Sequence, residues 1–212
     1  MTRSVFPDAV AKDWERAVIL EGVVTTRNVD GTINVAPMGP IFELPIQGFL
    51  FRPFQTSTTY QNLKREGCGV FHITDDVLLI AQAALGQLVS VPPTIPATQI
   101  AGAVLEDCCR WYEFVVETLD DSQARTEITT RIVHAGQRRE FLGFNRAKHA
   151  VLEGAILATR LHLLSNSTVR AELDRMAMIV EKTAGRQEQE AFGLIVRYVE
   201  DYASETHKFD EV

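Results

Sequence analysis

The sequence predicts an α+β protein, in which a small β-barrel of about six mainly antiparallel strands precedes a C-terminal region of three helices. Two observations carry this prediction. Short β-branched runs alternate with turn residues over the first two thirds of the chain, and apolar residues recur at helical spacing in the last third. No Gly/Ser-rich linker or internal repeat separates them. We therefore expect residues 1–143 to form the barrel and residues 144–212 to pack on it or on a dimer partner.

Strands are predicted in the order of the chain. A hairpin comes first, with strands at 19–27 and 32–36 joined by the turn residues Asn28–Gly31. The remaining strands are expected at 48–52, 69–74, 111–118 and 126–133. In the last of these, apolar and polar residues alternate, which is typical of a strand buried on one face.

Two short helices and a loop are expected between these strands. One helix is predicted over 57–65, and a second begins at Asp75-Asp76 and continues to Leu85. Residues 91–98 contain three prolines. Because proline cannot donate to a strand ladder, we expect this stretch to be a crossover or an exposed loop without regular pairing.

The C-terminal region begins at Asn145, which is a candidate helix cap. Small residues then form a seam that permits close helix packing, at positions 147, 150, 154 and 158. A polar break at 165–168 precedes a second helix marked by Val169, Leu173, Met176 and Val180. The third helix begins after Gly185 and ends in an acidic tail, residues 200–211, that we expect to be solvated.

Composition narrows the class of function. The chain has 212 residues and a formal charge of −7, which would repel nucleic acid and anionic lipid. Residues 1–17 lack the apolar core of a secretory signal, and the longest apolar run, 77–85, is much shorter than a membrane span. We therefore expect a cytoplasmic protein that binds neither nucleic acid nor membrane.

Cysteine and basic residues indicate no site by themselves. Cys68, Cys108 and Cys109 are too few for a disulfide framework and lack metal-ligand spacing, so we expect them to act as small hydrophobic residues. Arg138 and Arg139 form the densest basic pair, and a glutamate follows them at once. This pattern favours a solvated turn over a polyanion site.

The most informative stretch for binding is Arg52-Pro-Phe-Gln-Thr-Ser-Thr-Thr-Tyr-Gln-Asn62. An arginine and four consecutive hydroxyl residues precede a predicted helix start, where unpaired amides favour an anion such as a phosphate monoester. The alternative is that Thr56 and Ser57 cap the helix while Arg52 forms a surface ion pair. The sequence leaves both interpretations open.

A second stretch, Asn34-Val-Ala-Pro-Met-Gly-Pro40, lies at the end of a predicted strand and contains a proline and a glycine where the strand stops. Backbone groups freed there could face a planar ligand, with Met38 against its face. The alternative is a strand that simply ends at proline.

Histidine and carboxylate residues suggest no other active site. The five histidines are scattered and show no metal-ligand spacing. At Asp75-Asp76, helix capping is favoured over acid–base chemistry. His149 stands out, because Arg146 and Lys148 place further polar donors on the same predicted first turn, although that turn could also be simply solvated.

Taken together, the motifs carry a resemblance. The order Asn-Val-Ala-Pro-Met-Gly, then Arg-Pro-Phe-x-Thr-x-x-Thr-Tyr-x-Asn-Leu, then Val-Phe-His-Ile-Thr-Asp-Asp resembles the FMN-binding split-barrel superfamily, which includes flavin reductases. The stretch from Phe144 to Glu153, followed by Ala-Thr-Arg160, is similar to a prokaryotic family of split-barrel flavoproteins that carry a C-terminal helical region. The resemblance covers residues 18–202.

The resemblance implies a homodimer that binds FMN near its subunit interface. It assigns the phosphate to Arg52, Thr56, Thr59 and Asn62, and the ring to the strand end at Ala36, Pro37, Met38 and Gly39. It also implicates Thr74 and Asp75, together with Asn145, Arg146 and His149 of the family-specific segment. His72 departs from the pattern, because many relatives have asparagine there, so the resemblance supports no ring contact at this position.

Two functions are compatible with these features. The first is an FMN-dependent oxidoreductase, similar to flavin reductases, whose second substrate is a nicotinamide nucleotide or another small redox compound. The alternative is a non-catalytic FMN carrier or a dimeric interaction module. No residue is assigned a catalytic role, and no metal is expected.

Overall fold

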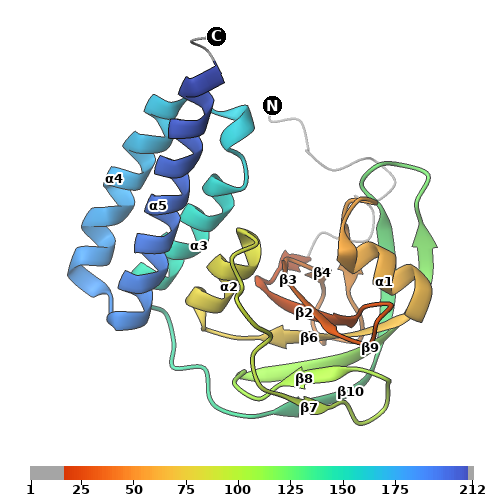
Figure 1. Cartoon of the computed structure of the whole chain (residues 1–212). Coiled ribbons are helices and arrows are strands. Elements are labelled where there is room, and N and C mark those ends of the chain that lie inside the picture. The colour runs from red at the N-terminus through yellow and green to blue at the C-terminus, as the bar shows by residue number, and fades with distance from the viewer. Residues whose placement is uncertain (1–16, 210–212) are drawn as a thin grey trace, which may run out of the picture.

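The computed structural model describes residues 17–209, with side chains described as far as Ser204. A curled β-sheet and a helical bundle stand side by side, and α2 lies between them (Figure 1). The segment 1–16, in which no secretory signal is expected, lies outside the described residues, as does the end of the acidic tail. No helix in the described part of the chain is long and apolar enough to cross a membrane.

The main sheet is antiparallel and has the strand order β1-β4-β5-β10-β9-β6-β2-β3. Its strands are β1 (Val18–Ile19), β2 (Gly22–Arg27), β3 (Ile33–Met38), β4 (Ile41–Phe42), β5 (Leu50–Phe51), β6 (Cys68–Ile73), β9 (Arg110–Asp120) and β10 (Glu127–Gln137). Every strand predicted from the sequence is present. The hairpin prediction is confirmed, because β2 pairs with β3 from Gly22↔Met38 to Arg27↔Ile33.

The strand count differs from the predicted six, because the sheet has eight strands. Two runs of chain are each divided by a break, at Leu20–Glu21 between β1 and β2 and at Gly39–Pro40 between β3 and β4. Pro40 cannot donate to a ladder, but its carbonyl accepts a hydrogen bond from Leu20 N at 3.2 Å across the breaks. Since β4 pairs with β5 while β2 pairs with β6, the two runs draw the sheet into a curled half-barrel.

The prediction that residues 91–98 form no regular pairing is wrong. There, β7 (Thr94–Pro96) pairs with β8 (Ala103–Leu105) in a separate two-stranded sheet. Pro96 is the last residue of β7, so its missing N–H does not interrupt the strand. Proline is tolerated in such strands because only an interior position in a ladder requires the N–H group.

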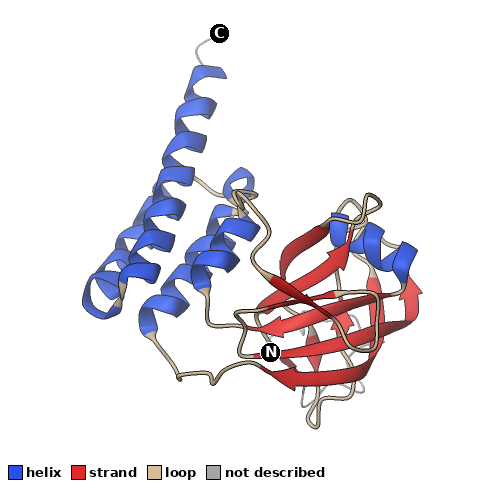
Figure 2. Cartoon of the chain, turned by 60° about the horizontal axis from the view of Figure 1, so that its bottom comes forward, coloured by secondary structure: helices blue, strands red, loops and turns tan. Residues whose placement is uncertain are grey.

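The two short helices have the expected caps. Helix α1 (Thr58–Glu66) begins at Ser57, whose side chain accepts from Tyr60 N, and ends at Gly67 in the left-handed conformation. Helix α2 (Val77–Ala84) begins at Asp76, whose carboxylate accepts from Leu79 N. Figure 2 shows α1 on the side of the barrel that faces away from the bundle.

The C-terminal region contains α3 (Arg146–Ala158), a short 3₁₀ helix (Leu161–Leu163), α4 (Asn166–Thr183) and α5 (Arg186–Phe209). Asn145 caps α3 as predicted. The small-residue seam is buried, and it packs in one core with residues of α4 and α5. Residues of α2, among them Val77 and Ala81, belong to this core as well. The helical layer therefore has four α-helices rather than three.

Aromatic side chains fill the interior of the barrel. Phe49 lies at the centre, with ring centroids 5.0 Å from Phe71, 5.6 Å from Tyr112 and 5.7 Å from Phe51. Tyr60 of α1 is buried in the same cluster. Burial of this apolar surface holds α1 against the barrel, and so fixes the position of the hydroxyl-rich segment that precedes the helix.

Candidate functional site

The N-terminus of α1 is free of negative charge. Ser57 caps the helix, and no acidic residue lies in the first turn. The amides of Thr58 and Thr59 precede the intrahelical hydrogen-bond ladder by the geometry of any α-helix. The side chains of Thr56 and Thr58 are exposed. This helix end therefore has amide and hydroxyl donors available to an anion.

Arg52 precedes this helix start by a few residues in the chain, and one of its guanidinium nitrogens makes no hydrogen bond. Its Nε lies 3.4 Å from Glu127 Oε1, so the surface ion pair of the alternative interpretation is present. However, Nε is buried and has no hydrogen-bond partner within residues 17–209. Since a buried polar atom without a partner is uncommon, the ion pair with Glu127 only partly accounts for this arginine.

Helix α1 is tied to the start of β3 by side-chain hydrogen bonds. Thr59 Oγ1 accepts from Asn34 Nδ2 at 3.2 Å. Asn62 donates to Thr26 Oγ1 at 3.0 Å and to Asn28 Oδ1 at 2.8 Å, so both of its amide hydrogens are used within the protein. The structure thus places the hydroxyl-rich segment and the Asn34–Pro40 stretch next to each other in one chain.

Strand β3 leads from α1 toward the helical bundle. It includes Ala36, Pro37 and Met38, and so extends past the predicted end at residue 36. Met38 packs against the aromatic core of the barrel and is half-buried. With a rise of about 3.3 Å per residue, Asn34 and Met38 lie ~13 Å apart along the strand.

Gly39, just beyond β3, lies against the side chain of Glu21. A methyl group added at Gly39 would be 3.0 Å from Glu21 Oε1 and 2.9 Å from Ile19 Cγ2, so only glycine fits without displacing them. Although much of Glu21 is exposed, desolvation of its carboxyl group raises its pKa, and the charge of Glu153 on α3 raises the pKa further. Helix α3 therefore runs close to this end of β3.

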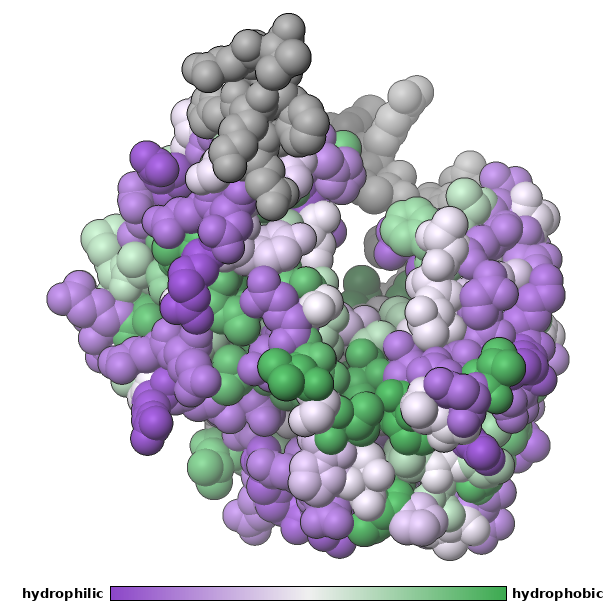
Figure 3. Space-filling model, in the orientation of Figure 1, coloured by the Kyte–Doolittle hydropathy of each residue, from purple (hydrophilic) through white to green (hydrophobic). Residues whose placement is uncertain are grey.

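The exposed face of α3 carries two of the predicted site residues. Arg146 and His149 are both solvent-exposed, and the His149 ring lies 5.8 Å from that of Phe144, with 30° between the planes. Figure 3 shows the surface hollowed between the bundle and the barrel, with apolar residues along the lower part of the hollow. We call this hollow the barrel–bundle cleft.

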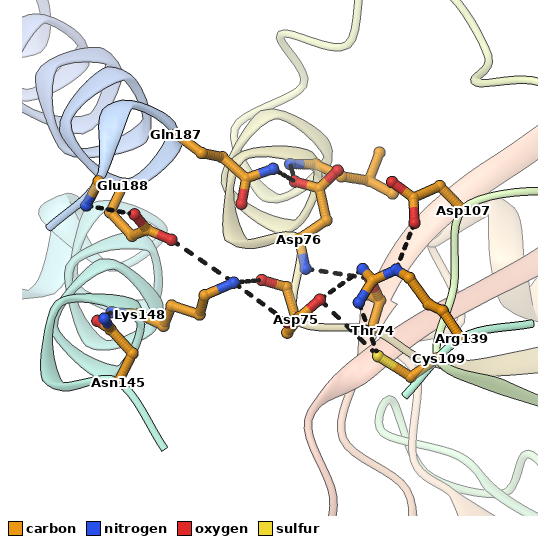
Figure 4. Close-up of polar contacts among 12 residues, drawn as sticks. Thr74, Asp75, Asp76, Asp107, Cys109, Arg139, Asn145, Lys148, Gln187 and Glu188 are labelled. Carbon is orange, nitrogen blue, oxygen red and sulfur yellow. Dashed lines mark hydrogen bonds and ion pairs between the residues drawn. The ribbon is translucent and has the colours of Figure 1, made fainter. Parts of the chain in front are cut away.

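Thr74, Asp75 and Asn145 lie where β6 meets the bundle, and each is already engaged (Figure 4). The Thr74 hydroxyl accepts from Asp76 N at 3.1 Å. Asn145 caps α3 through Lys148 N and donates to the carbonyl of Thr183 at 3.0 Å. The Asp75 carboxylate is bound by two cationic side chains.

The expectation that Arg139 belongs to a solvated turn is wrong. Its guanidinium group contacts Asp75 Oδ1 and Asp107 Oδ1, each at 2.5 Å. These carboxylates raise the pKa of Arg139 above its ordinary value, most strongly through the hydrogen bond with Asp75. Burial alone would raise the pKa of Asp75, but Arg139 and Lys148 outweigh it and hold the pKa low. Because these partners lie far apart in sequence, charge spacing could not reveal them.

Two buried polar residues were not assigned a role by sequence reasoning. Glu113 is fully buried, and its carboxylate accepts from the amides of Thr98 at 2.8 Å and Gln99 at 2.6 Å. His72 is also fully buried, between Val23 O and the amide of Leu105. Each of these polar residues interrupts an apolar strand segment, and this interruption is the one sequence signal that could have identified them. Both residues hold loops of the scaffold.

The predicted site residues therefore form two groups, one at each end of β3. Thr59 and Asn62, on the helix that Arg52 and Thr56 precede, contact the hairpin at its start, whereas Gly39 and the α3 residues lie toward its end. Two cavities, of about 440 and 530 Å³, flank the loop 43–49 and contain none of the predicted residues. No cluster of three metal-ligating side chains occurs in the described part of the chain.

The fold defines the class of protein as a split β-barrel joined to a C-terminal helical bundle. The chain belongs to the family described as protein of unknown function (DUF447), whose N-terminal domain matches residues 20–139 and whose C-terminal part matches residues 145–197. The resemblance inferred from the sequence is thus confirmed for family and fold. A search of curated proteins gives no match.

One solved structure supports the same fold, and two others align more weakly. An FMN-bound protein of this family from Methanosarcina mazei aligns with a TM-score of 0.72 at 23% identity, over 85% of this chain and 94% of that one. A flavoredoxin from Methanosarcina acetivorans aligns with a TM-score of 0.49 at 13% identity, over 68% and 76% of the two chains. A 2-nitrobenzoate 2-nitroreductase from Pseudomonas fluorescens gives 0.47 at 19%, over 56% and 64%.

Proposed function

We propose that this protein binds FMN, with the phosphate at the start of α1 and the isoalloxazine ring at the end of β3. The observation that carries the proposal is Arg52, whose Nε is buried without a hydrogen-bond partner and which precedes, in the chain, a helix N-terminus free of acidic residues. A phosphate monoester would satisfy this cation and the first-turn amides together. The FMN-bound structure of similar fold supports the assignment.

The residues of the chain fit an elongated cofactor with an anionic tail. Arg52, Thr56 and Thr59 would hold the phosphate, and Asn62 would fix α1 on the hairpin through Thr26. Because β3 leads away from α1, a ligand following it would carry its ring past Ala36 and Pro37 to Met38 and Gly39. Thr74, Arg146 and His149 would then border the ring side of the cleft.

We further propose that the protein is an oxidoreductase of the flavin-reductase type and acts as a homodimer. When bound, FMN would supply the hydride or electron chemistry, so no side chain need form a covalent intermediate. The barrel–bundle cleft would admit a second ligand, such as a nicotinamide nucleotide, to the ring side. The chain's own part is to bind, orient and shield the reacting groups.

Titration of FMN into Arg52→Ala tests the phosphate site. Loss of a charge-assisted hydrogen bond should weaken binding by about 1.5–3 kcal/mol, roughly a 10- to 150-fold rise in Kd by calorimetry. Riboflavin, which lacks the phosphate, should bind the variant and the parent equally. Lys64→Ala, at the other end of α1 and already paired with Asp121, is the matched control. Equal FMN affinity in Arg52→Ala would place the phosphate elsewhere.

The reaction class needs a separate experiment. The FMN-loaded protein is mixed anaerobically with NADH or NADPH, and flavin absorbance is followed. Bleaching by either nucleotide supports the oxidoreductase proposal, and gel filtration of the same sample tests the dimer. If FMN binds tightly and a chemical reductant bleaches it but neither nucleotide does, the carrier function is favoured instead.

A further inference from the structure

We propose that Asp75 and Lys148 form a latch that positions the first turn of α3 against the barrel, and that Asp75 acts through this latch rather than by touching a ligand. Asp75 follows β6, whereas Lys148 lies in the first turn of α3, 73 residues further along the chain. The effect of this latch on cofactor binding rests on the proposed function, whereas the existence of the latch does not depend on it.

The contacts of Asp75 leave its carboxylate no free oxygen. Oδ1 accepts from Arg139 and lies 3.8 Å from Cys109 Sγ, and Oδ2 lies 3.3 Å from Lys148 Nζ. Lys148 Nζ also donates to the Asp75 backbone carbonyl at 2.6 Å. Lys148 thus binds both the side chain and the main chain of Asp75. These contacts fix the distance between the end of β6 and α3 (Figure 4).

The same lysine connects α3 to the last helix. Lys148 Nζ lies 3.5 Å from Glu188 Oε1, while Glu188 Oε2 accepts from Gly185 N at 2.7 Å at the start of α5. A second link joins α5 to α2, because Gln187 donates to Asp76 Oδ1 at 3.0 Å. Lys148 therefore stands where the strand end, α3 and α5 meet.

Burial distinguishes this network from a surface ion pair. The side chains of Asp75 and Glu188 are only 8% and 9% exposed, and that of Lys148 is 23% exposed. At such burial, loss of one partner removes a compensating charge from a group that water reaches poorly, so the geometry of the pair is held. Arg146 and His149, on the exposed face of the same helical turn, are carried into place by this contact.

Hydrogen exchange tests the latch without any cofactor. In Lys148→Met, and in the milder Lys148→Gln, the amides of residues 148–152 should exchange at least tenfold faster than in the parent, because the turn is no longer held. Lys148→Arg should restore most of the protection, and Lys182→Met, at an exposed site on α4, should change nothing. Unchanged exchange in both Lys148 variants that fold would overturn the latch.

The visible circular dichroism of bound FMN tests the positioning role. A shifted flavin spectrum in Lys148→Gln that returns to the parent form in Lys148→Arg supports it. Faster exchange with an unaltered spectrum would show that the latch has no influence on the cofactor side, and the positioning role would fail. If the parent binds no FMN, the proposed function is rejected, while the exchange experiment alone still decides the latch.

Discussion

The two ends of β3 use charged residues in opposite ways. At the α1 end, Arg52 faces a single carboxylate at 3.4 Å and keeps a buried nitrogen without a hydrogen bond. At the α3 end, Arg139 and Lys148 are both bound by acidic side chains, and Asp75 joins them. The predicted ligand residues lie at both ends, and within the described residues the first end has a buried cationic nitrogen without a hydrogen bond.

This contrast separates binding from scaffolding. A cation whose donors are unsatisfied can gain hydrogen bonds when an anion arrives, whereas one that is already paired would have to lose its present partner first. The α1 end is therefore suited to recognise a phosphate, and the α3 end is suited to hold two layers of the fold together. Three predictions run from the largest expected effect to the smallest, and the second and third of them test this division.

Acid should destabilise the barrel through His72. Its Nε2 accepts from Leu105 N, so the buried ring is neutral, and burial lowers its pKa to about 4 from 6.5. The unfolded chain therefore binds the proton more readily, and stability falls as the pH drops from about 6.5 to 4. We expect protonation of His72 to lower the free energy of unfolding by about 2–3 kcal/mol between pH 7 and pH 4.5, as measured by denaturant unfolding.

The control for this experiment is His72→Gln, whose side-chain oxygen can still accept from Leu105 N. The variant should be less stable at pH 7 because its packing is altered, but it should lose less stability toward pH 4.5 than the parent. A variant with the same pH dependence as the parent would show that other groups cause the acid sensitivity.

The latch can be tested by comparing two aspartates that bind the same arginine. The Asp75 side chain is 8% exposed and that of Asp107 is 73% exposed, although both lie 2.5 Å from Arg139. Asp75→Asn should lower the free energy of unfolding by about 2 kcal/mol, because it removes the buried carboxylate that pairs with both Arg139 and Lys148. Asp107→Asn should cost less than about 0.5 kcal/mol. Equal losses would contradict the scaffolding role of Asp75.

The smallest effect is expected at Glu127. Glu127→Gln removes the carboxylate that competes for Arg52, so FMN should bind about two- to fivefold tighter, corresponding to a surface pair worth ~0.4–1 kcal/mol. Glu117→Gln, which removes the partner of the exposed Arg131, is the control and should leave the Kd unchanged. Weaker FMN binding in Glu127→Gln would mean that the pair orients Arg52 instead of occupying it.

Local sequence signals predicted most of the elements correctly. The hairpin turn at 28–31, the helix after Ser57 and the cap at Asn145 all depend on residues within a few positions of one another. The small-residue seam of α3 was likewise predicted, because helical periodicity alone places its members on one face. The two-stranded sheet at 94–105 was missed, since proline content argued against pairing that its place at a strand end permits.

Contacts between distant residues could not be predicted in this way. The partners of Arg139 lie 32 and 64 positions away, and Lys148 reaches Asp75 across 73 positions. Nothing in the local spacing distinguishes these charges from a solvated turn. The resemblance did select Asp75, but as a cofactor residue, and the structure shows its carboxylate engaged by the protein itself.

The sequence by itself determined most of the succession of strands and helices, their caps and the hydroxyl-rich character of the segment after Arg52, because those properties arise from neighbouring residues and backbone geometry. Only the tertiary structure decided that α2 joins the bundle, that the two breaks at residues 20–21 and 39–40 curl the sheet, and which cations remain unsatisfied. Whether a charged side chain is paired within the protein depends on its burial and on partners that folding brings together. Neither property is encoded in the spacing of residues along the chain.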